Sequence, residues 1–192
     1  MKGRPLAMTE KEKKDIRTQG SAARAAYLGM MLAFALILGY AESLLPLSFA
    51  IPGIKLGLPN LAVLLVLYRS GTKNAFIIAV LRIALSGFLF GSLYSILYSL
   101  AGGLVSFLMM ICMKKTGRFG ISGVSLAGGV THNIGQLAVA AFVVETGGLF
   151  YYLPPLLVAG VVTGLLNGIV AGQIQRRLAG RSTDDDRMGF ML

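Results

Sequence analysis

The sequence predicts an all-α integral membrane protein with six transmembrane helices, and two observations lead to this fold class. Hydrophobic residues make up 55% of the 192 residues and charged residues only 14%, which lies well outside the balance of soluble domains. The apolar residues also form long runs, and the lysines and arginines cluster in the short segments between them. This clustering argues against a basic nucleic-acid-binding face, despite the net charge of +10.

Six apolar runs are candidates for membrane spans, because a bilayer core about 30 Å thick needs about 20 apolar residues in a helix. They extend from Ala25 to Leu45, Leu56 to Tyr68, Asn74 to Phe90, Leu93 to Met113, Ile121 to Val144 and Phe150 to Ile174. The second and third runs are short. Prolines and glycines interrupt the stretch LPLSFAIPGIKLGLPN before the second run, so we expect a broken or re-entrant segment between the first two helices, from Pro46 to Pro59.

The placement of lysine and arginine predicts the orientation in the membrane. With six spans, all of these residues except Lys55 and Arg82 fall on one side. Both termini are then cytoplasmic, in a multi-pass protein of a bacterial-type plasma membrane. We expect a basic N-terminal tail over residues 1–24, a transmembrane domain over 25–175 and a polar C-terminal tail over 176–192.

Small residues recur at helical spacing in the last and first spans, where they let another backbone approach closely. In the last span the predicted packing residues are Gly160, Gly164, Gly168 and Gly172. In the first span the small residues include Ala22, Ala26, Gly29 and Ala33. This second surface either packs inside the protein or docks a separate membrane subunit.

Polar side chains at membrane depth are costly unless they face the protein interior or a wet cavity, so each is a candidate for function. The candidate substrate-binding residues are Glu42, Lys55, Asn60, Arg82, Ser95, Tyr98, His132, Asn133, Gln136 and Asn167. At about 1.5 Å per residue, Arg82, His132 and Gln136 lie in the middle or outer half of the membrane. We expect a common cavity that opens to the outside.

Each candidate also has a structural interpretation. His132 is either a ligand contact or a neutral core histidine, and Arg82 either binds an anionic group or pairs with Glu42 or Glu145. Lys55 can be a solvated loop charge. The polar row on the fourth span, which includes Ser92, Ser95, Ser99 and Ser106, lines a cavity or serves ordinary helix packing.

Several stretches between Tyr40 and Gly172 resemble a family labelled heptaprenyl diphosphate synthase component I, also described as the Gx transporter family. They are YAESLLP, IPGIKLGLPNLAVL, RIALSGFLFGS, GGVTHNIGQL and GVVTGLLNG. This family is similar to the substrate-binding S components of energy-coupling-factor (ECF) transporters. The resemblance implies a six-helix S-component-like bundle, a cargo site beneath the loop between the first two helices, and a first helix that meets a coupling subunit. No vitamin-specific signature identifies the cargo.

The synthase label conflicts with the chemistry of the sequence. A prenyl diphosphate synthase needs carboxylate clusters that hold Mg²⁺ on a diphosphate. The only acidic cluster is Asp184, Asp185 and Asp186, near the C-terminus. The single Cys112 and the single His132 give no metal-ligand pattern. We therefore expect no catalysis, no metal and no cofactor.

The sequence favours a substrate-binding membrane subunit of an ECF-type importer for a small anionic or amphipathic molecule. Arg82 and Lys55 would attract an anionic group of the cargo, while His132, Asn133 and Gln136 would hydrogen-bond its polar edge. A GxxxxGK[ST] phosphate loop is absent, so a coupling transmembrane subunit and ATPase subunits are the expected partners. The alternatives are a non-catalytic membrane subunit associated with heptaprenyl diphosphate synthesis, and a scaffold whose polar residues pair internally.

Overall fold

The computed structural model describes residues 10–44, 57–91, 93–145 and 147–188, and their side chains from 20 to 178 except that of Val144. The elements are α1 (Glu10–Ser43), α3 (Pro59–Arg69), α4 (Thr72–Phe90), α5 (Leu93–Lys115), α6 (Ile121–Val144), the 3-10 helix η1 (Gly147–Tyr152) and α7 (Leu153–Met188). These described ranges contain six α-helices and no strand. The predicted all-α membrane bundle is confirmed.

Five helical segments are long and apolar enough to cross a membrane, whereas α3 is shorter. With 11 residues, α3 is about 16 Å long, roughly half of a bilayer core. Its last residue, Arg69, lies at the end of the bundle that also carries Arg24, Lys73 and Lys115, here called the basic end. Pro59 therefore begins α3 near mid-membrane. Most of the predicted broken segment, including Lys55, lies outside the described residues.

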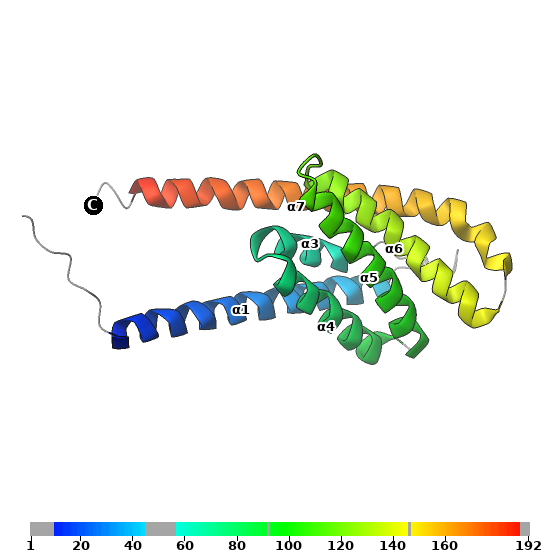
Figure 1. Cartoon of the computed structure of the whole chain (residues 1–192), viewed down its shortest axis with the longest axis horizontal. Coiled ribbons are helices and arrows are strands. Elements are labelled where there is room, and N and C mark those ends of the chain that lie inside the picture. The colour runs from blue at the N-terminus through cyan, green and yellow to red at the C-terminus, as the bar shows by residue number, and fades with distance from the viewer. Residues whose placement is uncertain (1–9, 45–56, 92, 146, 189–192) are drawn as a thin grey trace, which may run out of the picture.

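Helices α1 and α7 extend beyond the bundle on the same side (Figure 1). They contain 34 and 36 residues, or about 50 Å each, which exceeds the thickness of a bilayer core. The segments predicted as polar tails are thus partly helical, from Glu10 in α1 and up to Met188 in α7. Their Lys, Glu and Arg residues are good helix formers, so a helix does not have to end at the membrane surface.

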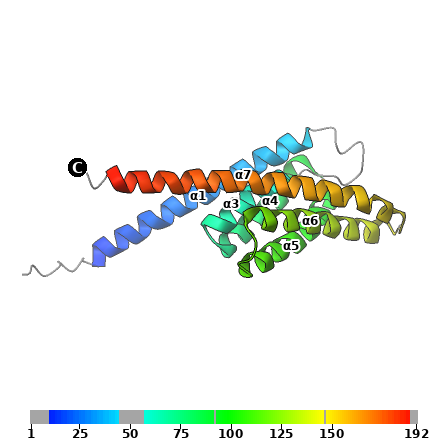
Figure 2. The same ribbon diagram turned by 90° about the horizontal axis from the view of Figure 1, so that it is seen from above.

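Helix α3 lies in the interior of the bundle, among α1, α4 and α7. Nearly all of its side chains are buried, from Pro59 to Leu67 except Asn60, and they form the main hydrophobic core with α4, α5 and α7. Helix α1 crosses the molecule obliquely on one side (Figure 2) and packs on α3 and α4.

The basic end of α3 is fixed by polar side chains of neighbouring helices. The Lys114 Nζ donates to the Leu67 carbonyl at 2.6 Å, and the Gln175 amide donates to the Leu65 carbonyl at 3.3 Å. The Leu67 carbonyl lies in the last turn of α3, where carbonyls have no partner within the helix, so the bond from Lys114 satisfies it. Arg24 of α1 also donates to Asn74 of α4 at 3.0 Å, which ties α1 to the same end.

Helices α6 and α7 pack closely through glycines. A Cβ on Gly164 would lie 2.8 Å from the Leu126 Cα, and a Cβ on Gly160 would lie 2.9 Å from the Gly129 carbonyl oxygen. Further along α7, a Cβ on Gly168 would lie 2.5 Å from the Ser122 Cα, and a Cβ on Gly172 would lie 3.1 Å from the Ile121 side chain. All four glycines singled out in the sequence therefore face α6, where the absence of side chains allows two backbones to touch.

Candidate functional site

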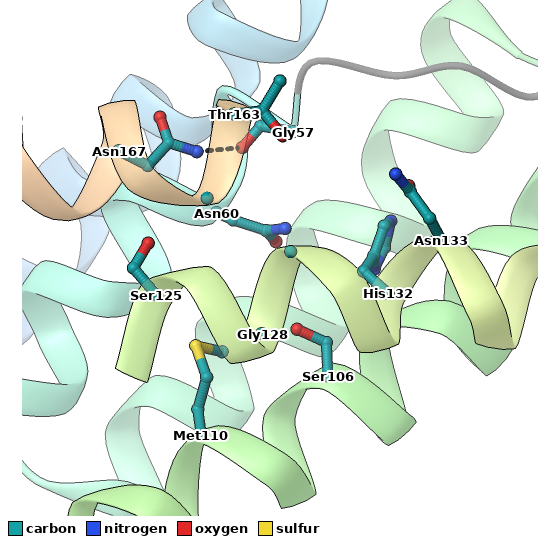
Figure 3. Close-up of a pocket in the computed structure, with 12 residues that line it drawn as sticks. Gly57, Asn60, Ser106, Met110, Ser125, Gly128, His132, Asn133, Thr163 and Asn167 are labelled. Carbon is teal, nitrogen blue, oxygen red and sulfur yellow. Dashed lines mark hydrogen bonds between the residues drawn. The ribbon is translucent and has the colours of Figure 1, made fainter. Parts of the chain in front are cut away.

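A small polar pocket lies between α5, α6, α7 and the start of α3 (Figure 3). Its volume is about 10 Å³, which is close to the space that one water molecule needs. The lining residues are Gly57, Asn60, Ser106, Met110, Ser125, Gly128, Gly129, His132, Asn133, Thr163, Gly164 and Asn167. None of these twelve residues is acidic, and none is a lysine or arginine.

The polar side chains of the pocket also connect the helices around it. The Asn133 amide of α6 donates to the Leu156 carbonyl of α7 at 2.8 Å, and Asn167 of α7 donates to the Gly57 carbonyl at 2.8 Å. Each of these bonds uses the donor end of an amide whose other end is an acceptor. The pocket therefore combines structural hydrogen bonds with groups that can recognise a ligand.

Gly57 explains how the chain enters the bundle at membrane depth. Its φ of +66° lies in the left-handed region, which glycine adopts without steric cost. Non-helical backbone inside a membrane must be satisfied by the protein. Here the Gly57 N–H donates to Glu42 Oε1 at 2.9 Å, while its carbonyl accepts the bond from Asn167. Two predicted site residues, Glu42 and Asn167, thus form hydrogen bonds to the backbone that precedes α3.

Arg82 is not a lining residue of the pocket, but it contacts the lining residue Asn60 and is 9% exposed. Its Nη2 donates to the Asn60 Oδ1 at 2.6 Å, and its charge interacts with that of Glu42. Both Arg82 and Asn60 lie about 15 Å along their helices from the basic end. Of the two carboxylates that the sequence offers to Arg82, Glu42 is the one whose charge acts on it. Glu145 terminates α6 in a left-handed conformation.

The structure brings together only part of the predicted substrate-binding set. Asn60, His132, Asn133 and Asn167 line the pocket, and all but Asn60 are buried. Arg82 and Glu42 reach it through Asn60 and Gly57.

Three further predicted residues lie within the described part of the chain but do not line the pocket. Gln136 is buried one turn beyond His132, where a Cβ on Gly102 of α5 would lie 2.5 Å from its Cγ. Ser95 and Tyr98 are half-buried on α5, at least 12 Å along that helix from Ser106. Ser92 and Lys55 are outside the described residues.

The pocket lies nearer to the basic end than the sequence predicts. Ser125 is about 6 Å and Asn133 about 18 Å from the start of α6, whose full length is about 36 Å. The lining thus occupies the half of α6 that adjoins the basic end and reaches the middle. The sequence predicts a cluster in the middle or outer half, because it counts every polar residue at that depth. It does not tell which of these residues lie on the helix faces that line the pocket.

Sequence reasoning missed six pocket residues: Gly57, Met110, Ser125, Gly128, Gly129 and Thr163. A signal for three of them exists in the spacing, since residues four apart share a helix face. Ser125 and Gly128 lie seven and four residues before His132, and Thr163 lies four before Asn167. The polar or small residues on these faces continue the row that His132 and Asn167 begin.

One buried hydroxyl of the pocket is not used by the protein. The Ser106 side chain is 2% exposed, and its Oγ has no hydrogen-bond partner among the described residues. The same part of the chain contains no group of three or more His, Cys, Asp or Glu residues that could hold a metal ion.

The family comparison agrees with the resemblance noted in the sequence. The sequence profile of the family described as heptaprenyl diphosphate synthase component I matches residues 31–174, which include every described helix of the bundle in whole or in part. No curated protein and no solved structure matches the chain significantly. The chain therefore belongs to the heptaprenyl diphosphate synthase component I family.

Proposed function

We propose that this chain is the substrate-binding membrane subunit of an ECF-type importer. The supporting observation is the polar pocket enclosed by α5, α6, α7 and the start of α3, in the half of the bundle that adjoins the basic end and reaches its middle. A membrane protein keeps polar groups at this depth at an energetic cost, and such groups mark a pathway or binding site in the first instance. A subunit that binds cargo and leaves ATP hydrolysis to its partners needs such a pocket.

The exposure of α1 supports a docking partner in the membrane. Only 6% of the apolar window of α1 is buried, compared with 28% to 39% in the other four spans. The small residues expected to dock a partner are all exposed, namely Ala22, Ala26, Gly29 and Ala33. Small residues favour close helix packing over contact with lipid alone. We assign this face to the coupling transmembrane subunit, with the ATPase subunits bound to that subunit.

A non-catalytic role is part of the proposal. The acidic cluster that begins at Asp184 lies about 25 Å along α7 beyond Asn167, so it cannot act on a molecule held in the pocket. No residue that lines the pocket is a carboxylate, whereas a diphosphate–Mg²⁺ complex calls for carboxylate oxygens.

The proposed orientation follows from the basic end. Arg24, Arg69, Lys73 and Lys115 are found at that end of α1, α3, α4 and α5, and basic residues favour the cytoplasmic side. The exposed aromatic residues Phe150 and Tyr151 lie at the opposite end, as expected at a membrane interface. We place both termini in the cytoplasm of a bacterial-type cell, with the cargo arriving from the opposite side.

A second candidate is a non-catalytic membrane subunit associated with heptaprenyl diphosphate synthesis. The family description favours it. In this role the chain would assemble with a soluble prenyl-transferring subunit and would hold a lipid chain. The polar lining of the pocket favours the importer, because a groove for a prenyl chain would be apolar.

Purification of the tagged chain from its own membranes in mild detergent tests the proposal. We expect a coupling membrane protein and an ATPase pair to co-purify. Ala26→Leu should abolish this assembly, because a large side chain would separate the docking helices. Ala41→Leu makes the same change at an exposed position 15 residues further along α1 and should have no effect. Recovery of a prenyl-transferring enzyme instead of an ATPase pair would favour the second candidate.

A further inference from the structure

We propose that the pocket recognises an uncharged hydrogen-bonding group of the cargo about the size of a water molecule, such as a hydroxyl or carbonyl. This inference rests on the proposed function and specifies its substrate class. It differs from the expectation of an anionic cargo, which depends on Arg82 and Lys55 being available to a ligand.

Among the described residues, the cation beside the pocket already has a counter-charge. None of the twelve residues that line the pocket is Asp, Glu, Lys or Arg. The cation that contacts a lining residue, Arg82, donates through Nη2 to Asn60 and interacts with the carboxylate of Glu42, while its Nε has no hydrogen-bond partner among the described residues. An anionic group in the pocket would have to compete with Glu42 for this one cation. In a medium of low dielectric constant, the resulting excess of negative charge would be strongly unfavourable.

The start of α3 at the pocket does not provide an anion site either. A helix N-terminus attracts anions when its first N–H groups point at the ligand. Here Pro59 has no N–H, and the N–H groups of Asn60 and Leu61 donate to the carbonyls of Gly57 and Leu58 at 2.9 and 3.0 Å. The Gly57 N–H donates to Glu42. These backbone donors are therefore engaged before any ligand arrives.

The size of the pocket and its remaining polar groups specify the ligand group more closely. A volume of about 10 Å³ admits one oxygen-sized group. The Ser106 hydroxyl, 2% exposed and without a partner among the described residues, can donate and accept a hydrogen bond. Asn60 accepts from Arg82 through its Oδ1, so its amino group can still donate to a ligand. Asn167 donates to Gly57 through its amino group, so its side-chain carbonyl can still accept from one.

Glycine at position 128 keeps this space open. A Cβ there would lie 2.7 Å from the Met110 Cγ and 3.2 Å from the Ser106 Oγ. A methyl group at this position would therefore occupy the space beside the hydroxyl. The larger, apolar remainder of the cargo would have to extend away from this recess.

Three probes that share one ring separate the charge classes. They are 3-pyridinemethanol, nicotinate and 3-(aminomethyl)pyridine, which carry a neutral hydroxyl, an anionic carboxylate and a cationic ammonium group at pH 7.5. Their affinities for the full chain in lipid nanodiscs can be measured by ligand-observed NMR titration. We expect the alcohol to bind at least about tenfold more tightly than either charged probe, since one uncompensated buried charge costs more than the free energy of a tenfold change.

Two variants locate the binding. Ser106→Ala should weaken binding of the alcohol about fivefold through the loss of one hydrogen bond, and Gly128→Ala should weaken it further. Ser86→Ala is the matched control, because Ser86 lies on α4 outside the pocket and donates to the Ile83 carbonyl.

Tighter binding of nicotinate, equal binding of all three probes, no binding of the alcohol, or binding that Ser106→Ala leaves unchanged would each overturn the inference. None of these results would affect co-purification with ATPase subunits. That assay separately decides the importer function.

Discussion

Replacement of Arg82 by methionine should destabilise the protein, and simultaneous replacement of Glu42 by glutamine should add little further loss. Arg82 is 9% exposed, and its partners are the Asn60 Oδ1 at 2.6 Å and the charge of Glu42. Methionine keeps the apolar length of the side chain but leaves the Glu42 carboxylate without its counter-charge. Glutamine at position 42 removes that charge and can still accept the hydrogen bond from Gly57.

The expected magnitude follows from the burial of the two groups. Removal of one partner of a fully buried ion pair costs about 3–5 kcal/mol. Glu42 is only half-buried, so we expect Arg82→Met to lower the free energy of unfolding by about 2–3 kcal/mol. Glu42→Gln should cost a similar amount, because it leaves Arg82 as the uncompensated charge. The double variant should cost about as much as either single variant, which corresponds to a coupling of about 2 kcal/mol.

Reversible unfolding in mixed micelles measures all four proteins of this cycle under the same conditions. Additive effects, within about 0.5 kcal/mol, would refute the pairing of Arg82 with Glu42. If Arg82→Met has normal stability but no longer binds cargo, Arg82 contacts the ligand, which is the other alternative that the sequence offers.

Three further substitutions test the packing and the entry of α3. Gly164→Ala places a Cβ 2.8 Å from the Leu126 Cα and should lower the free energy of unfolding by about 1–3 kcal/mol in the same assay. Gly20→Ala is the control, because a Cβ there has nothing within 4 Å, and it should cause no loss of stability. Equal effects of the two variants would contradict the close packing of α6 and α7. Asn167→Leu removes the donor to the Gly57 carbonyl and should cost about 1–3 kcal/mol; an unchanged free energy of unfolding would show that this bond is dispensable. Gly57→Ala forces a Cβ into a backbone conformation with φ of +66° and should cost about 1–2 kcal/mol; full stability would contradict this geometry.

The helices themselves could be predicted from the sequence because membrane depth imposes a simple length rule. The predicted span from Ile121 to Val144 has the same limits as α6, and the prediction for α5 ends two residues early. At the outer ends of α1 and α7, polar residues continue the helix beyond the predicted apolar spans. Hydropathy measures burial in lipid, whereas helix formation depends on backbone hydrogen bonds and propensity, so the two limits need not coincide.

The site could be predicted only in part, because it depends on how the helices are rotated and paired. The polar character of Asn60, His132 and Asn167 at membrane depth was sufficient to select them. The sequence could not decide whether Arg82 faces a ligand or Glu42, because the distance between α1 and α4 is set by their packing on α3. For the same reason, Ser95 and Ser106 belong to one row on α5, but only Ser106 reaches the pocket.

The central claim is that the pocket formed by α5, α6, α7 and the start of α3 holds cargo. Small-molecule mass spectrometry of the purified, then denatured, protein tests it most directly. We expect a compound in near-equal molar amount with the native chain and with Gly147→Leu, an exposed change with nothing within 4 Å, but not with a folded Gly128→Leu variant. The same compound at the same level in all three proteins, or no compound in any of them, would contradict the account.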